Sequence, residues 1–223
     1  MKLRVIITGA TGMIGEGVLH ECLQHPNVEK ILIINRKPSG YTHPKLTEMV
    51  HADFHDLSPV QSRLSGYDAC FFCLGVSSIG LKEPEYHRLT YELTTTFAFA
   101  VLKLNPDMTF CYVSGSGTDG TEKGRSMWAR VKGKTENALQ RMFRKSFAFR
   151  PAFIEPTPGL RNTLKLYKYV GWMTPTLKIF APNYICSLRE IGLAMITVAA
   201  VGYEKPVLEV KDIIAVARRT PPI

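Results

Sequence analysis

No apolar run in this sequence is long enough to cross a lipid bilayer. The longest mostly apolar stretch covers residues 191–203, whereas a spanning helix needs about 20 such residues. The sequence also shows no signal peptide, because it passes from Arg4 directly into the strand-like run Val5-Ile6-Ile7. We therefore expect a soluble protein that stays in the cytoplasm.

Cysteine is too scarce and too irregular for a disulfide scaffold. The chain has five cysteines in 223 residues, an odd number in a chain that is not small. Cys70 and Cys73 form a C-x-x-C pattern, but they lie in the apolar run of residues 69–74. On a strand, positions i and i+3 point to opposite faces. We therefore interpret both as buried structural residues, and we predict no metal site.

Acidic residues are outnumbered, 19 against 28 Lys and Arg, so the formal net charge is +9. Residues 1–112 carry 10 basic and 11 acidic groups, whereas residues 113–223 carry 18 and 8. An anionic partner is therefore expected to meet the second half. The hydrophobic share of 45% and the charged share of 21% are typical of a globular chain. They exclude a largely disordered protein, and the length fits one domain.

The excess of positive charge is densest in residues 123–178, which hold 13 Lys and Arg against only two acidic residues, Glu136 and Glu155. This segment would suit a phosphorylated or carboxylated small-molecule substrate. Its mixture of cations and aromatics at residues 164–169 would also suit a protein or an anionic membrane surface. Nucleic acid is disfavoured, because no recognised binding motif is present. A solvated basic surface remains an equal alternative, and the oligomeric state is left open.

Short apolar runs alternate with helical spacing along the first 150 residues. This rhythm predicts parallel strands joined by helices, an α/β fold with a doubly wound parallel sheet of the Rossmann type. We expect a dinucleotide-binding core over residues 1–155 and a small C-terminal substrate or partner lobe of the same domain over residues 156–223. Strands are expected at residues 3–8, 31–34, 48–50, 68–74, 109–114, 147–150 and 207–210, and helices at 13–23, 86–104, 127–145, 160–170, 187–201 and 212–217.

The strongest motif is the run T-G-A-T-G-M-I-G at residues 8–15, between the first strand and the first helix. In that position a G-x-x-G-x-x-G run is typical of dinucleotide binding. Gly9 would permit the tight turn, Gly12 would let backbone amides approach a pyrophosphate, and Gly15 would let the helix pack on the strand. The helix N-terminus would then direct its positive dipole end at the phosphates.

This spelling resembles the extended and atypical short-chain dehydrogenase/reductases, of the epimerase/dehydratase, NmrA-like and Tat-interacting-protein types. The resemblance covers about residues 1–155. It implies a nicotinamide cofactor held by the glycine loop, by the ends of the strands and by the segment that passes the nicotinamide. The residues that it assigns to cofactor binding are Gly9, Thr11, Gly12, Met13, Ile14, Gly15, Asp53 near the adenine amino group, Leu74 and Gly75 beside the ribose, Lys132, and Pro151 at the nicotinamide.

No acidic residue follows the second strand, where an NAD-selective fold places one to bind the ribose 2′-hydroxyl. The strand is followed instead by Asn35, Arg36 and Lys37. A guanidinium can pair with a 2′-phosphate and stack on adenine. We therefore predict NADP(H) rather than NAD(H), with Arg36 and Lys37 as the residues that select it.

The Tyr-x-x-x-Lys pair of the short-chain dehydrogenases is altered. The matching register places Lys132 correctly but puts Trp128 in the tyrosine position, and no tyrosine lies between Tyr112 and Tyr167. An indole N–H is only a donor and does not titrate near neutrality, so it cannot relay a proton as a phenol does. A core aromatic at Trp128 and a solvated lysine at Lys132 are the alternatives.

The active-site hydroxyl of the family could come from Ser116, which we favour, or from Ser114. Substitutes for the missing phenol are Asp119, Glu122, Tyr86 and His87, and the sequence does not choose among them. Two functions follow. The chain is either an NADP-dependent oxidoreductase or epimerase with a modified dyad, or a non-catalytic NADP(H) sensor or scaffold.

Overall fold

A computed structural model describes residues 2–162 and 182–219. Its centre is a seven-stranded sheet in the order β3-β2-β1-β4-β5-β6-β9, with every neighbouring pair parallel. The strands are β1 (Leu3–Thr8), β2 (Val28–Asn35), β3 (Leu46–Val50), β4 (Ala69–Phe72), β5 (Thr109–Val113), β6 (Lys145–Arg150) and β9 (Val207–Glu209). The chain runs outward from β1 to β3 and then returns to the other side of β1, so the strand order reverses between β1 and β4.

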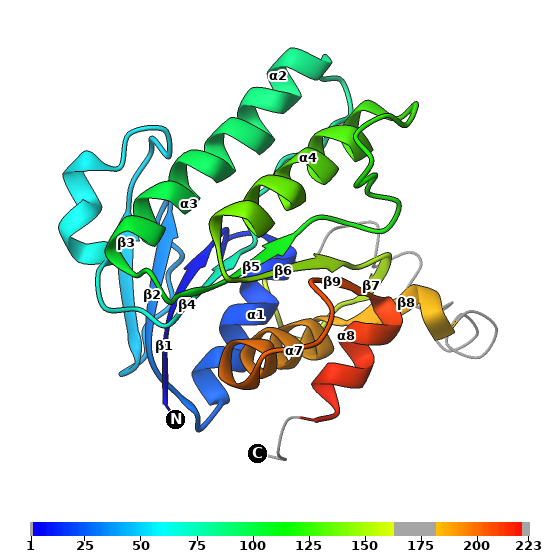
Figure 1. Ribbon diagram of the computed structural model, residues 1–223. Helices are drawn as coiled ribbons and strands as arrows, with labels where there is room; N and C mark the ends of the chain where they lie inside the picture. The colour runs from blue at the N-terminus through cyan, green and yellow to red at the C-terminus, as the bar shows by residue number, and fades with distance from the viewer. Residues whose placement is uncertain (1, 163–181, 220–223) are drawn as a thin grey trace.

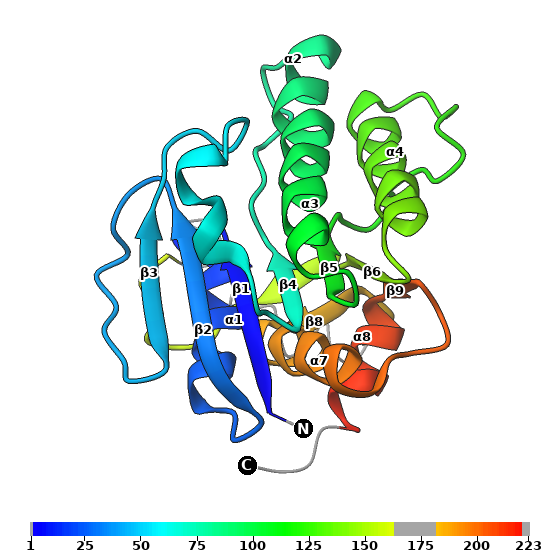
Figure 2. The ribbon, with the colours of Figure 1, turned by 60° about the vertical axis from the view of Figure 1, so that its left-hand side comes forward.

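Helices cover both faces of this sheet (Figures 1 and 2). One face carries α1 (Met13–Gln24), α7 (Leu188–Val201) and α8 (Val210–Ala217). The other carries α2 (Glu83–His87), α3 (Leu93–Leu104) and α4 (Met127–Met142), with a π-turn η2 (Arg88–Glu92) between α2 and α3 and a 3-10 helix η1 (Ser58–Leu64) near β3. The predicted doubly wound Rossmann-type α/β fold is therefore confirmed.

The strand sequences explain why there are two cores. Val5 and Ile7 of β1 lie in the core under α1 and α7, whereas Ile6 lies in the core under α3. A sheet buried on both faces needs apolar side chains at successive positions, as the sequence supplies. The same alternation buries Cys70 in the second core, while Cys73 lies just beyond the end of β4 and is half-buried. Both thiols are unpaired, as are the other three cysteines.

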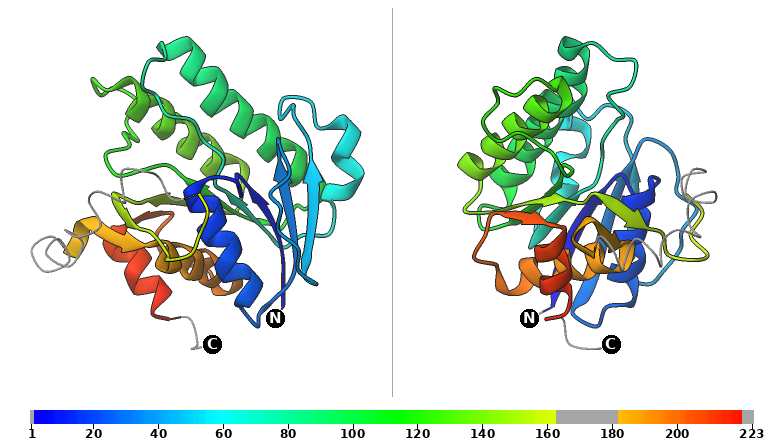
Figure 3. Two further views of the ribbon diagram at one scale, coloured as in Figure 1. Left: turned by 180° about the vertical axis from the view of Figure 1, so that it is seen from behind. Right: turned by 90° about the vertical axis from the view of Figure 1, so that its right-hand side faces the viewer.

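Much of the second half of the chain belongs to this layered arrangement of one sheet between helices. β9 forms the edge of the sheet next to β6, and α7 packs against α1 (Figure 3). The two helices approach closely at Gly192, where a Cβ atom would lie 2.7 Å from Glu21 Cγ. Ser187 and Glu190 form the expected capping box at the start of α7. The division at residue 156 and the substrate or partner lobe stay predictions.

Some boundaries differ from those expected. The helix predicted over residues 127–145 ends at Met142, because Phe143 turns into an extended conformation and is buried, and Lys145 pairs with Thr109 as the first residue of β6. A small parallel sheet of β7 (Phe153–Glu155) and β8 (Ile185–Ser187) was not predicted. Of the helix expected over residues 160–170, positions 163–170 lie outside the described residues. In the described part of the chain, no helix has the length and hydrophobicity needed to cross a membrane.

One histidine is buried without full hydrogen bonding. His25, the residue that ends α1, is 2% exposed. Its Nδ1 accepts the Asn27 N–H, and its Nε2 has no hydrogen-bond partner among the described residues. Lys45 Nζ donates to the carbonyl oxygen of the same residue. Burial first, and the Lys45 charge second, lower the pKa of His25 below its usual value of 6.5.

We predict that His25 makes the protein less stable in mild acid. The unfolded chain takes up a proton at His25 as the pH falls through about 6.5, while the folded chain resists it, so the free energy of unfolding falls in that range. His25→Asn keeps an acceptor for Asn27 but cannot titrate. Chemical denaturation between pH 8 and pH 5 should therefore give a shallower loss of stability in this variant. The exposed His55→Asn is the control, and an equal slope in all three proteins would contradict the prediction.

Candidate functional site

The glycine run forms a tight turn between β1 and α1. Gly9 has φ +72°, a left-handed conformation that favours glycine, and its carbonyl oxygen accepts the Gly12 N–H at 2.9 Å. A Cβ atom at residue 15 would overlap the Gly9 carbonyl group, so only glycine fits there. No side chain caps α1, whose first residues follow Gly12. The helix N-terminus therefore opens towards the carboxyl end of the sheet with its amide donors uncovered.

A cleft of about 430 Å³ lies at this end of the sheet, where the strand order reverses. Ligands of open α/β sheets bind at such a position. The predicted residues that line it come from the glycine turn, the ends of β4 and β5, α4 and the residue after β6: Gly12, Met13, Ile14, Leu74, Gly75, Ser114, Lys132 and Pro151.

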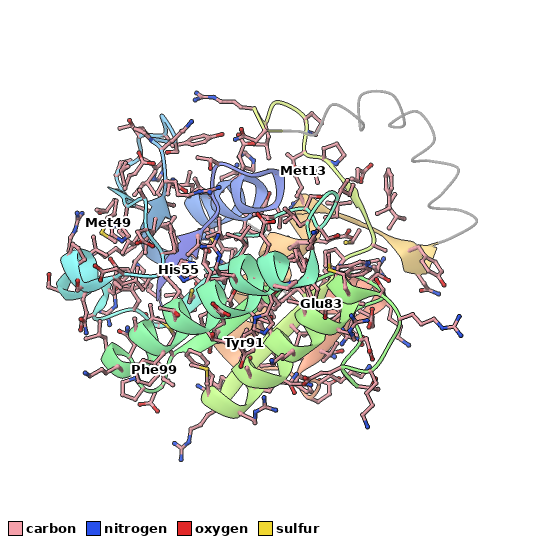
Figure 4. All side chains as sticks on the ribbon, turned by 90° about the horizontal axis from the view of Figure 1, so that it is seen from above. Met13, Met49, His55, Glu83, Tyr91 and Phe99 are labelled. Carbon is pink, nitrogen blue, oxygen red and sulfur yellow. The ribbon has the colours of Figure 1, made fainter. Side chains whose placement is uncertain are left out.

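A second cavity, of about 170 Å³, adjoins the cleft at Leu74, Gly75 and Val76. The predicted residues Arg36 and Asp53 line it, together with His55 and Arg88, which the sequence analysis did not single out. Figure 4 labels Met13 of the cleft and His55 of the cavity.

Other predicted residues do not line either space. Gly9 and Gly15 shape the glycine turn between β1 and α1, but they line neither the cleft nor the smaller cavity. Thr11 and Lys37 are exposed, and Lys37 lies outside the smaller cavity although its neighbour Arg36 lines it. Ser116 and Trp128 also lie outside the lining of both spaces.

Lys132 reaches the cleft from α4. Its ammonium group donates a hydrogen bond to the Ser114 carbonyl oxygen at the end of β5. Burial lowers the pKa of Lys132 to about 8, and the carboxylate of Glu136, one turn further along α4, opposes that shift. Lys132 therefore changes charge near neutral pH, which a solvated lysine would not do.

Glu136 is itself held by a half-buried arginine. Arg150 at the end of β6 makes two hydrogen bonds to the Glu136 carboxylate, of 2.6 and 3.0 Å, and another of 3.2 Å to Glu209. Glu136 is 2% exposed. Removing Arg150 would leave the buried Glu136 carboxylate without this pairing, whereas removing Glu136 would leave Arg150 paired with Glu209 alone. The pair fixes α4, and with it Lys132, against β6.

A loop over residues 115–124 also positions α4. A Cβ atom at Gly133 would overlap the Asp119 carbonyl group, so the helix and the loop are in direct backbone contact. The Asp119 N–H donates to the Ala129 carbonyl oxygen at 3.1 Å. Glycine next to Lys132 thus lets the helix sit close enough for the lysine to enter the cleft.

The two candidate serines differ in position. Ser114 is 6% exposed, lines the cleft and donates its hydroxyl proton to the Phe149 carbonyl oxygen at 3.2 Å. Ser116 donates its backbone N–H to the Pro151 carbonyl oxygen at 2.9 Å. Their bonds extend the β5–β6 pairing past the strand ends and hold Pro151 at the cleft.

Trp128 lies against the loop. Trp128 lies on α4, one turn before Lys132. Its indole ring is 3.5 Å from the position that a Cβ atom at Gly117 would occupy. No tyrosine among the described residues lines the cleft or the smaller cavity. The titratable side chains that the described residues contribute to the cleft are Lys132 and Cys73, and burial raises the pKa of the Cys73 thiol to about 12.

The substitute acids also lie outside the lining of the cleft. Asp119 accepts hydrogen bonds from Thr121 and Gly124, and these lower the pKa of its carboxyl group. Glu122 accepts one from Asn137, and Tyr86 is 1% exposed. His87 lies between Glu92 and Lys134, at 3.2 Å from each.

Two carboxylates that the sequence analysis missed, Glu16, which is buried, and Glu48, which is half-buried, organise the surroundings. Glu48 of β3 accepts hydrogen bonds from the Asn35 side chain at 3.0 Å and from the Ser39 N–H at 2.8 Å, which holds the loop that carries Arg36. Glu16, in the first turn of α1, accepts bonds from the Tyr41 hydroxyl and from the N–H groups of residues 161 and 162. Neither role has a local sequence signal, because the partners lie far away in the chain.

Known proteins share this architecture. The chain resembles the solved structure of MoeE5 in complex with UDP-glucose and NAD, with a TM-score of 0.65, 16% identity and coverage of 97% of this chain and 82% of that one. It also resembles a UDP-N-acetylglucosamine 4-epimerase from Methanobrevibacter ruminantium M1 (TM-score 0.65, 17% identity, 93% and 76%) and a glucuronic acid dehydrogenase from Chromohalobacter salexigens (TM-score 0.68, 14% identity, 93% and 76%). At these identities the likeness shows the fold.

Sequence comparison supplies the family. Leucinostatins biosynthesis cluster protein T of Purpureocillium lilacinum is 30% identical over 122 residues, which are 53% of this chain but only 45% of that protein. The model of the NAD dependent epimerase/dehydratase family matches residues 5–136, from β1 to Glu136 on α4. That match covers more than half of the chain and includes the glycine turn and Lys132, so this chain belongs to the NAD dependent epimerase/dehydratase family.

Proposed function

We propose that this chain binds NADP(H) along the cleft and the smaller cavity, and acts as an oxidoreductase or epimerase with a modified dyad. One observation carries the proposal: the uncapped N-terminus of α1 opens on a cleft that adjoins a smaller cavity lined by Arg36. Backbone amides and a helix dipole suit a pyrophosphate, and a guanidinium suits a 2′-phosphate. A cytoplasmic location stays a prediction.

Each part of the cofactor has a matching group of residues. The pyrophosphate would lie on the amides of Met13 and Ile14, beside Gly12, whose own N–H is donated to the Gly9 carbonyl oxygen. The adenosine would fill the smaller cavity, with Asp53 at the adenine amino group. Lys132 would hold the nicotinamide ribose, and Pro151 would border the nicotinamide ring. When bound, this group would supply hydride transfer, and the chain would bind, orient and exclude water around it.

NADP is favoured over NAD by the end of β2. The side-chain amide of Asn35 stands where an NAD-selective protein has an acid, and it donates to Glu48 at 3.0 Å. Glu48 is also bound by the Ser39 N–H, so its oxygen is already engaged. Arg36 follows directly and lines the cavity. A cation at this position, with no acid directly after β2, suits a phosphate better than a hydroxyl.

A small anionic substrate is part of this proposal. Several structural neighbours were solved with UDP-sugars, such as MoeE5 with UDP-glucose. A sugar nucleotide carries phosphates, which the surplus of Lys and Arg in the second half of this chain would attract. We therefore propose a phosphorylated or carboxylated sugar derivative as the substrate class.

A non-catalytic NADP(H) sensor or scaffold is the second candidate function. The observation that favours it is Trp128, which occupies the tyrosine position yet lies against Gly117 rather than in the cleft. Without a phenol the described site has no proton relay of the usual kind. In this case the basic second half would meet a protein or an anionic membrane surface.

Arg36→Ala should weaken NADPH binding by about 10-fold or more and change NADH binding little, because a hydrogen bond to a charged group contributes about 1.5–3 kcal/mol. Isothermal titration calorimetry with both cofactors measures this. Arg63→Ala on η1, outside both cavities, is the control for loss of one positive charge. Equal losses for the two cofactors would refute the NADP assignment.

The pH dependence of cofactor binding should report the charge of Lys132. Because the pKa of Lys132 is lowered to about 8, its positive charge is present at pH 7 and disappears as the pH rises through 8. The dissociation constant for NADPH should therefore increase between pH 7 and pH 9. Lys132→Met should weaken binding at pH 7 and flatten this profile, whereas Lys134→Met on the same helix should leave it unchanged. A wild-type profile as flat as that of Lys132→Met would contradict the assignment.

Turnover separates the two candidate functions. If the chain is an enzyme, Lys132→Ala should lower the rate of NADPH oxidation with a panel of carbonyl sugars by about 100-fold, the scale of a lost general acid or base. If wild type is inactive and Trp128→Tyr creates activity, the sensor function is supported. Trp128→Phe, which adds no phenol, is the matched control. Activity in the phenylalanine variant equal to that of Trp128→Tyr would show that the phenol is not what matters.

A further inference from the structure

The smaller cavity has a second cation that the proposed function does not use. Arg36 enters it from the end of β2, and Arg88 enters it from the π-turn between α2 and α3. These two residues are 52 positions apart in the chain, yet both line a space of only about 170 Å³. π-turns inside helices occur frequently at functional sites.

Most other cations near the cleft already have partners. Arg130 pairs with Glu83 at 2.5 Å, and Arg150 pairs with Glu136 at 2.6 Å. Lys132 donates to the Ser114 carbonyl oxygen, and Lys134 lies 4.7 Å above the Tyr91 ring. By contrast, neither Arg36 nor Arg88 forms an ion pair with any acid in the described ranges 2–162 and 182–219.

Figure 4 shows that the helical segment from α2 through η2 to α3, which carries Arg88, lies alongside α4. Glu83 and Tyr91, which precede and follow Arg88 in the sequence, are labelled there. Leu89 and Leu93 of the same segment also line the cavity, as does Phe54 from the other side. These apolar side chains would enclose an adenine ring. The formally charged side chains of the lining are Arg36 and Arg88, which are positive, and Asp53, which is negative.

Arg36 and Arg88 both line this small cavity and both are exposed, so solvent screens their mutual repulsion, and an anion placed between them would be attracted by both. Asp53, whose Oδ1 accepts the His55 N–H at 2.8 Å, adds one negative charge to the same lining, so the two guanidinium groups leave an excess of one positive charge. A phosphate carries up to two negative charges and accepts bidentate hydrogen bonds from more than one guanidinium. The cavity therefore has the charge and the donors for a phosphate on an adenosine.

We propose that Arg88, together with Arg36, binds the 2′-phosphate of the NADP(H) adenosine and so selects this cofactor against NAD(H). The inference rests on the proposed function. It adds a specificity-determining residue on a helical segment after β4, far from the strand-end position where such residues are expected. The two arginines would hold the phosphate from opposite walls of the cavity.

Fragment ligands test the role of Arg88 without any turnover. Isothermal titration calorimetry with 2′,5′-ADP and 5′-AMP isolates the 2′-phosphate, because the two fragments are otherwise the same. Arg88→Gln should raise the dissociation constant for 2′,5′-ADP at least 10-fold and that for 5′-AMP less than 2-fold. Lys82→Gln, which removes an exposed charge just before α2, should change neither. Thermal melting of each variant checks that it is folded.

The double variant Arg36→Ala/Arg88→Gln tests whether the two residues hold one phosphate. If they do, the combined loss for 2′,5′-ADP differs from the product of the single losses, because residues that share one partner are not independent. Equal losses for both fragments in Arg88→Gln, or no loss, would overturn the inference. If wild type binds the two fragments equally, the NADP proposal itself fails. If wild type prefers 2′,5′-ADP and only Arg36→Ala removes the preference, NADP binding stands and the role of Arg88 falls.

Discussion

The contact between the Gly9 carbonyl group and the start of α1 governs the geometry of the whole site. Because residue 15 has no Cβ, the first turn of the helix can lie on the backbone of the preceding loop. Gly12 can then donate its N–H back to Gly9 and present the helix end to the cleft. A side chain at residue 15 would push the helix away. The N-terminal amides would then point elsewhere, and Glu16 in the same turn would lose its bonds to Tyr41 and to residues 161 and 162.

A second close contact does the same for the other end of the cleft. Gly133 lets α4 touch the backbone at Asp119, and the Arg150–Glu136 pair fastens the helix to β6. These constraints fix the position of Lys132, whose ammonium group donates a hydrogen bond to the Ser114 carbonyl oxygen. The burial that results lowers its pKa. The lowered pKa of Lys132 is thus a consequence of backbone packing around it, and Trp128 one turn earlier packs against Gly117.

The fold and the tight glycine turn could be predicted from the sequence because both have local signals: continuous apolar strands and glycines at fixed spacing. Motif register and strand ends also predicted that Lys132, Leu74, Gly75 and Pro151 meet at one edge of the sheet, and all four line the cleft, while their roles toward a cofactor stay predictions. The sequence could not indicate Arg88, because the direction of that side chain depends on how the helical segment after β4 returns to the sheet. The helix end at Met142 was missed for a related reason, because Phe143 leaves the helix to fill a core that only tertiary structure defines.

The net charge of +9 suggested that the second half of the chain meets an anion, but charge count and available charge differ. In the described residues, several second-half cations beside the cleft are occupied by internal partners: Arg130 by Glu83, Arg150 by Glu136 and Glu209, and Lys132 by a carbonyl oxygen. The guanidinium groups that line a cavity without an ion pair in that part of the chain, Arg36 and Arg88, come from the nearly neutral first half. An ion pair presents little net charge to a ligand, whereas a cation without an acidic partner keeps its charge available, although solvent screens it at exposed positions such as Arg36 and Arg88. Selection of an anionic cofactor can therefore depend on the first half of the chain, whose formal charges nearly balance. The cations available to a ligand are those that have no acidic partner within the protein.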